Sequence, residues 1–178
     1  MYTSRPILAH EEIRTRQGMV VAQHPLGSAV GLEVLQRGGN AVDAAISTAF
    51  AMGVLQPLMN GIGGGGLMTV YMAAGGGGAI DYGMQAPARA TTDEYPLEGG
   101  MESMNTGSSR YSRNFAWPKV KDDMLSSGYK SIAIPGTVAG LSRALDEWGT
   151  ISLSDALQPA IKLAEEGFAV GAHFTLST

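Results

Sequence analysis

The stretch QPLMNGIGGGG at residues 56–66, which runs directly into LMTVY at residues 67–71, decides how the chain folds. Five of the eleven residues before Leu67 are glycine, and four of these are consecutive. Each glycine in regular structure costs roughly 0.5–1 kcal/mol relative to alanine, because its unfolded backbone is freer. Such a run is expected where the backbone has positive φ or passes very close to another group. It either packs tightly against a neighbouring helix or strand, or lines a pocket.

This stretch was compared with two nucleotide-binding motifs, and it fits neither. Gly61, Gly63 and Gly66 have the spacing G-x-G-x-x-G, but that fingerprint follows a strand and opens a helix. Here a helical pattern comes before the glycines, and β-prone residues come after them. A phosphate-binding P-loop ends in Gly-Lys-Ser/Thr, whereas this loop ends in Gly-Leu-Met.

Two helices are predicted upstream of the glycines. One begins at Pro25, since proline suits the first helical position, and ends at Gly38-Gly39. The other runs from Ala41 to about Leu55 and is apolar nearly all round, which is typical of a buried helix. Asp43 lies in its first turn, where the helix dipole favours an anion, so a structural role is expected. Residues 19–22 are a short strand candidate.

Downstream, residues 67–73 and 79–82 are β-prone and flank four glycines at 75–78, which predicts a hairpin. Residues 91–129 are polar and lack periodicity, so we expect a functional loop or flexible excursion there. A helix is predicted from Val138 to Trp148. Another, capped by Ser152 or Ser154, ends near Gly167, with Pro159 as a candidate break.

Composition narrows the function classes. The chain is 44% hydrophobic and 16% charged, as in ordinary soluble globular proteins. Its net charge of −4 predicts no nucleic-acid partner. The absence of cysteine excludes disulfides, thiolate metal sites and a cysteine nucleophile. No apolar signal region or membrane span is seen, so a cytoplasmic location is expected if Met1 is the true start.

No residue set in the sequence forms a complete catalytic constellation. His10, His24 and His173 lack metal-ligand spacing, so each is expected on the surface or in a loop. No serine lies in a Gly-x-Ser-x-Gly elbow. The residues alone therefore predict a soluble α/β chain with a glycine-lined loop and no complete catalytic constellation.

The order of five segments closely resembles the gamma-glutamyltransferase family. They are GMVVAQHP at 18–25, GGNAVDAA at 38–45, NGIGGGG at 60–66, SIAIPGTVAG at 131–140 and PAIKLAEEG at 159–167. Together they span most of residues 18–170, and the 91–129 excursion is the part left unmatched. Any one match could be chance, but five in family order are a strong signal.

The resemblance implies a fold and a mechanism. The fold is the four-layer αββα sandwich of N-terminal nucleophile hydrolases, incomplete in this chain, with residues 1–178 as the N-terminal portion of the large subunit. The family's precursor cuts itself, and the new N-terminal threonine of the second, small subunit becomes the nucleophile, with its own α-amine as base. No catalytic residue is therefore expected in this chain. The implied substrate is a small-molecule amide or gamma-glutamyl compound, with no metal or organic cofactor.

One departure from the family pattern concerns the substrate. Members that use glutathione carry an arginine, in a run like Asp-Phe-Arg-Glu-x-Ala-Pro, that holds the α-carboxylate of the glutamyl group. Here the run is DYGMQAP at 81–87, with Gly83 in the arginine's place. A charge-assisted bond to a carboxylate contributes roughly 1.5–3 kcal/mol, or about 10- to 150-fold in binding. Arg89 is close enough in sequence to be a candidate substitute, although a solvated surface role is the alternative.

Three functions therefore stay open at the level of sequence. The first is part of a glutathione hydrolase-type amide hydrolase or acyltransferase. The second is an acylase of the same fold that acts on an amide without the gamma-glutamyl group. The third is a non-catalytic scaffold.

Overall fold

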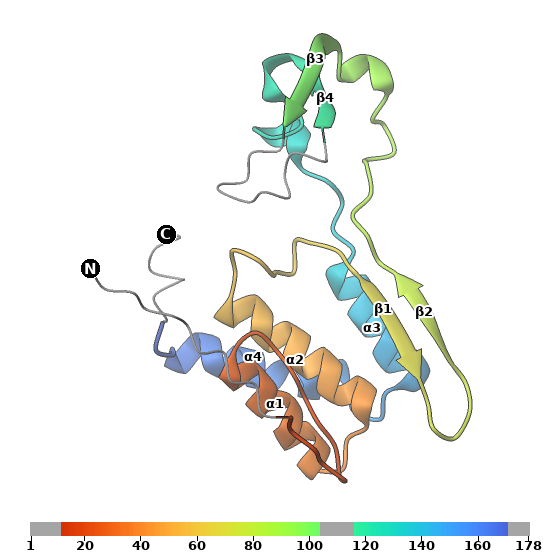
Figure 1. Ribbon diagram of the computed structural model, residues 1–178, viewed down its shortest axis with the longest axis vertical. Helices are drawn as coiled ribbons and strands as arrows, with labels where there is room; N and C mark the ends of the chain where they lie inside the picture. The colour runs from red at the N-terminus through yellow and green to blue at the C-terminus, as the bar shows by residue number, and fades with distance from the viewer. Residues whose placement is uncertain (1–11, 104–115, 171–178) are drawn as a thin grey trace. The chain divides into compact units, whose positions relative to one another are not determined.

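A computed structural model describes residues 12–103 and 116–170 (Figure 1). The elements in chain order are α1 (Pro25–Gln36), α2 (Ala41–Leu55), β1 (Leu67–Tyr71), β2 (Gly77–Asp81), β3 (Leu97–Ser103), β4 (Ala116–Val120), α3 (Thr137–Trp148) and α4 (Leu153–Glu166). Short 3-10 helices lie at Thr92–Glu94, Lys121–Asp123 and Tyr129–Ser131. The chain divides into two compact units, one of residues 1–61 and 143–178 and the other of residues 62–142.

Helix α2 forms the core of the first unit. It packs against both α1 and α4 (Figure 1), and its Ile46, Ala51 and Leu55 side chains are buried. The predicted bounds of α2 are confirmed, because Asn40 caps its first turn by accepting hydrogen bonds from the N–H groups of Val42 and Asp43. Burial of this largely apolar helix on two sides contributes much of the first unit's stability.

Asp43 ties the start of α2 to the linker between α3 and α4. Its carboxylate is fully buried and accepts four hydrogen bonds, two from Thr150 (2.6 and 2.8 Å) and one each from the backbone N–H of Asn40 (2.8 Å) and Ile151 (3.3 Å). Burial alone raises the pKa of the Asp43 carboxyl, but the hydrogen bonds outweigh it and hold the pKa below its ordinary value. The predicted structural role of Asp43 is confirmed.

Two predictions for this unit were wrong. Residues 19–22 do not form a strand, because no described segment pairs with them and Val21 is left exposed. Pro159 does not break α4, which is continuous from Leu153 to Glu166. A proline inside a helix removes one backbone hydrogen bond. The Ser152 cap and the buried Ala156 and Ala160 side chains hold the remainder of α4 in place.

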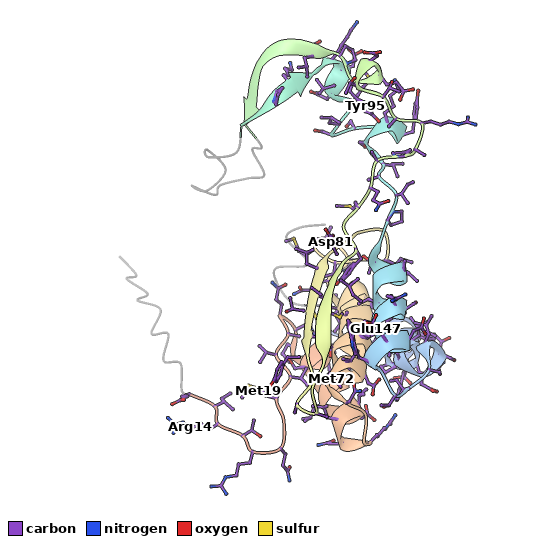
Figure 2. The ribbon with its side chains drawn as sticks, turned by 90° about the vertical axis from the view of Figure 1, so that its right-hand side faces the viewer. Arg14, Met19, Met72, Asp81, Tyr95 and Glu147 are labelled. Atoms are coloured by element: carbon purple, nitrogen blue, oxygen red, sulfur yellow. The ribbon has the colours of Figure 1, made fainter. Side chains whose placement is uncertain are left out.

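In the second unit, β1 and β2 form the predicted antiparallel hairpin, with Leu67 opposite Asp81 and Tyr71 opposite Gly77. The turn contains three glycines with positive φ, at 75, 76 and 77. This conformation is strained for other residues, so the glycine run is needed here. Figure 2 shows Met72 and Asp81 at opposite ends of the hairpin.

The composition of residues 91–129 predicted an irregular segment, but part of this segment is regular. It contains the antiparallel pair β3 and β4, whose register shifts between Leu97 and Met101. The glycines of β3 and Pro118 of β4 remove the alternation by which strands are normally predicted. Tyr95, labelled in Figure 2, donates a hydrogen bond from its hydroxyl to the Lys130 carbonyl (3.1 Å). Among the described helices, none is long and apolar enough to cross a membrane.

Candidate functional site

Three backbone segments of the second unit meet where the glycine loop ends: residues 64–66, 82–85 and 134–137. We call this meeting point the glycine junction. Gly66 and Tyr82 exchange two backbone hydrogen bonds (3.3 and 2.9 Å), which extend the hairpin by one residue pair. Gln85 and Ile134 exchange another two (3.1 and 2.8 Å). The segment after β2 is therefore bonded to the glycine loop on one side and to residue 134 on the other.

The glycine loop also caps helix α3. The carbonyl oxygen of Gly64 accepts hydrogen bonds from the backbone N–H groups of Gly136 (2.9 Å) and Thr137 (3.1 Å). Such N–H groups at a helix start have no partner within the helix and are usually satisfied by a side chain. Here a backbone carbonyl takes that part and joins the loop to α3.

Glycine is required at the junction because the backbones approach each other closely. A Cβ atom at Gly65 would lie 2.7 Å from both the Met84 nitrogen and the Tyr82 carbonyl oxygen. One at Gly136 would overlap the same carbonyl oxygen. In contrast, nothing lies within 4 Å of the Cβ position of Gly63. None of residues 63–66 has positive φ, so close approach, and not backbone strain, explains the glycines at 65 and 66.

The Tyr82 side chain lies within the junction. A Cβ atom at Gly66 would lie 2.8 Å from Cε2 of Tyr82, and one at Gly140 of α3 would overlap its Cβ and Cγ atoms. Burial raises the pKa of the Tyr82 phenol, since it disfavours the charged phenolate. The ring thus occupies the space that side chains at Gly66 and Gly140 would otherwise fill.

Gly83 is exposed and has space around it. Its N–H donates a hydrogen bond to Oδ1 of Asp81 (2.9 Å), an Asx turn that closes the end of β2. A Cβ atom at Gly83 would meet only that same oxygen, at 3.1 Å, and its φ lies outside the left-handed region. The backbone therefore does not demand glycine at 83, in contrast to Gly65 and Gly136.

Arg89 lies in a turn after Pro87, closed by a hydrogen bond from the N–H of Ala90 to the Pro87 carbonyl (2.8 Å). It is exposed, and no hydrogen bond or ion pair joins its side chain to the described residues. No hydrogen bond joins Arg89 to Gly83. Whether Arg89 holds a substrate carboxylate remains a prediction.

The junction supplies shape rather than reactive groups. In the described ranges, no three histidine, aspartate or glutamate side chains gather as metal ligands would. His24 caps α1 through its Nδ1 atom, which accepts from the N–H of Leu26 (3.2 Å). His10 and His173 lie outside the described residues. The arrangement can position a substrate or a neighbouring polypeptide, but it holds no nucleophile paired with a base.

Sequence reasoning missed Tyr82, Gly136 and Gly140. The two glycines are four residues apart, so they lie on one face of the α3 start, and an aromatic residue directly follows β2. These signals are local, and only the fold shows that they meet.

The sequence model of one protein family, gamma-glutamyltranspeptidase, matches residues 27–177. The chain belongs to this family. The resemblance carried by the five segments is therefore confirmed. Among family relatives, the glutathione hydrolase proenzyme of Bacillus subtilis strain 168 is 41% identical over 156 residues, which cover 87% of this chain and 24% of the relative. The acylase ACY 1 proenzyme of Pseudomonas sp. strain V22 is 42% identical over 154 residues, covering 86% and 25%.

Solved structures agree with the family assignment. The gamma-glutamyltranspeptidase of Helicobacter pylori superimposes with a TM-score of 0.74 at 34% identity, over 94% of this chain and 43% of that one. The fold is therefore the predicted α/β fold of N-terminal nucleophile hydrolases, and this gamma-glutamyltranspeptidase family chain holds part of the four-layer sandwich. It spans about a quarter of the length of the curated relatives described above.

Proposed function

We propose that this chain is the first part of the large subunit of a glutathione hydrolase-type amide hydrolase or acyltransferase. The observation that carries the proposal is the match to the gamma-glutamyltranspeptidase family over residues 27–177. The glycine junction supports it, because two of the five matched segments, 60–66 and 131–140, meet there. The relatives are named as proenzymes, which fits activation by cleavage.

In the proposed reaction, this chain positions the acyl part of the substrate and a second subunit from the same precursor supplies the threonine. The threonine hydroxyl gives its proton to the α-amine and attacks the amide carbonyl. The C–N bond breaks, the amine leaves with a proton, and the acyl group stays on the threonine oxygen as an ester. Water or another amine then takes the acyl group and frees the hydroxyl.

A second candidate function is an acylase that acts on an amide without the gamma-glutamyl group. Gly83 favours this candidate, since it leaves the family's carboxylate-holding position without a charge. The acylase ACY 1 proenzyme is as similar to this chain as the glutathione hydrolase proenzyme is. The two candidates share the threonine chemistry and differ in the acyl group that they accept.

The test begins with the reading frame that encodes this chain. We expect it to encode, downstream of Thr178, a threonine at a self-cleavage point, and the complete polypeptide to separate into two subunits on a denaturing gel. Steady-state kinetics with a gamma-glutamyl anilide and with aliphatic acyl anilides would then separate the two candidates. A frame without such a threonine, or a purified protein that hydrolyses neither substrate class, would favour the scaffold alternative and overturn the proposal.

A further inference from the structure

The ring of Tyr82 lies between Gly66 and Gly140. Gly66 lies against its outer end, where the Cε2, Cζ and Oη atoms would be 2.8 to 3.0 Å from a Cβ atom at residue 66. Gly140 lies against its inner end, the Cβ and Cγ atoms. A side chain at residue 66 or 140 would collide with the ring in this position. The lack of side chains at 66 and 140 and the presence of the ring at 82 are therefore parts of one arrangement.

The backbone on both sides of Tyr82 depends on that arrangement. The N–H of Tyr82 bonds to Gly66 (2.9 Å), and three residues later the N–H of Gln85 bonds to Ile134 (3.1 Å). Gly83 and Met84 lie between these two bonds, and both are exposed. The Tyr82 side chain lies against α3 at Gly140.

We infer that Tyr82 is a positioning residue for the substrate-binding part of the proposed site. Its ring, seated between Gly66 and Gly140, fixes the path of Gly83 and Met84. The inference rests on the proposed function only in taking residue 83 to face the acyl group. The ring acts through its shape, because its hydroxyl makes no hydrogen bond with the described residues and desolvation alone accounts for its raised pKa.

The first test compares three variants of the complete polypeptide that the gene encodes. Tyr82→Ala should raise KM for the better amide substrate by roughly tenfold and leave kcat within about twofold, because substrate placement is lost while the nucleophile is unchanged. Tyr82→Phe keeps the ring and should retain the wild-type KM. Tyr71→Ala is the matched control, since that tyrosine is 88% exposed on β1. The inference would be overturned if KM is unchanged in Tyr82→Ala, or if KM rises as much in Tyr82→Phe as in Tyr82→Ala.

The second test needs no enzymatic activity, so it stays informative if the proposed function fails. Hydrogen exchange at the amides of Tyr82 and Gln85 should become at least about tenfold faster in Tyr82→Ala and stay unchanged in Tyr71→Ala. The wild-type protein could hydrolyse no amide while the two variants show this difference in exchange. That result would contradict the proposed function and uphold the placement of the 82–85 backbone by the ring. If the exchange rates at both amides are the same in Tyr82→Ala as in the wild type, the inference is overturned.

A double-mutant cycle tests the contact itself. Gly66→Ala places a methyl group against the outer end of the ring and should speed exchange at the Tyr82 amide by about tenfold in the wild-type background. In the Tyr82→Ala background the methyl group meets free space, so the further effect of Gly66→Ala should fall below about twofold. Equal effects in both backgrounds would show that Gly66 and the ring do not share this space.

Discussion

Helix α2 and the glycine junction both join segments that are distant in the sequence, but they use different parts of the polypeptide. Around α2 the contacts are made by side chains, with Ile46 and Ala51 fully buried and the Asp43 carboxylate accepting four hydrogen bonds. At the junction they are made by backbone atoms, such as the Gly64 carbonyl that caps α3. A side-chain contact is lost when atoms are removed, whereas a backbone contact of this kind is lost when atoms are added. The two regions should therefore respond to opposite kinds of substitution.

The largest effect is expected from adding atoms at the junction. Gly65→Val should destabilise the protein by about 3 kcal/mol or more, because its side chain would push the 82–84 backbone away. Gly63→Val is the matched control and should change stability by less than about 0.5 kcal/mol, since its surroundings are open. Urea unfolding of the complete polypeptide measures both. Equal effects at 63 and 65 would show that the loop is only a slack connection.

Removing hydrogen-bonding capacity beside α2 should have the next largest effect. Asp43→Asn keeps the shape of the side chain but loses one acceptor oxygen, and we expect a loss of about 2 kcal/mol in unfolding free energy at pH 7. The folded-state pKa of Asp43 lies below its ordinary value of 3.8, so the carboxylate stabilises the fold above pH 3.8. That contribution is lost as the pH falls through the folded-state pKa.

Unfolding curves of wild type and Asp43→Asn at several pH values check this sign. The difference between the two proteins should be full at neutral pH and shrink towards low pH. A difference that grows on acidification would contradict the hydrogen-bonded carboxylate as the source of the stability.

These two regions also differ in how much of them the sequence predicts. The bounds of α2 and the role of Asp43 follow from Asn40, the alanine-rich run and the position of Asp43 in the first turn, all of which act within a few residues. The contact between Tyr82 and Gly140 joins residues that are far apart in the chain, so no local sequence pattern predicts it. The prediction of a strand at residues 19–22 was wrong for a similar reason. A strand needs a partner strand, and its own residues do not show whether one is present. Gly83 could be noticed only through the family pattern.

The third prediction concerns a substitution at Gly83, where the junction has space for a side chain. Gly83→Arg should lower KM for a gamma-glutamyl anilide by at least about tenfold if the added guanidinium reaches the α-carboxylate. Stability should change little, since a Cβ atom at 83 meets only the movable Asp81 side chain. Gly83→Gln is the matched control of similar length without charge. A wild-type protein that already turns over gamma-glutamyl substrates as well as Gly83→Arg does would show that another group holds the carboxylate.

The smallest effect is expected from removing atoms at Arg89. Its side chain is exposed and without a described partner, so Arg89→Ala should alter stability by less than about 0.5 kcal/mol and KM by less than about twofold. The same kinetic assay measures it. A tenfold rise in KM that is specific to gamma-glutamyl substrates would identify Arg89 as the substitute for the missing arginine.

The cap on α3 has a consequence for how this part of the chain tolerates insertions and deletions. A helix capped by a side chain loses its cap by a single point mutation, but the Gly64 carbonyl belongs to every amino acid and survives any change of residue identity that the space permits. It is displaced instead when a residue is inserted or deleted between Gly64 and Gly66, because Gly66 is held by Tyr82 and the Gly64 carbonyl then no longer faces the N–H groups of Gly136 and Thr137. The length of this short segment is therefore under tighter constraint than the residue type at an open position such as Gly63.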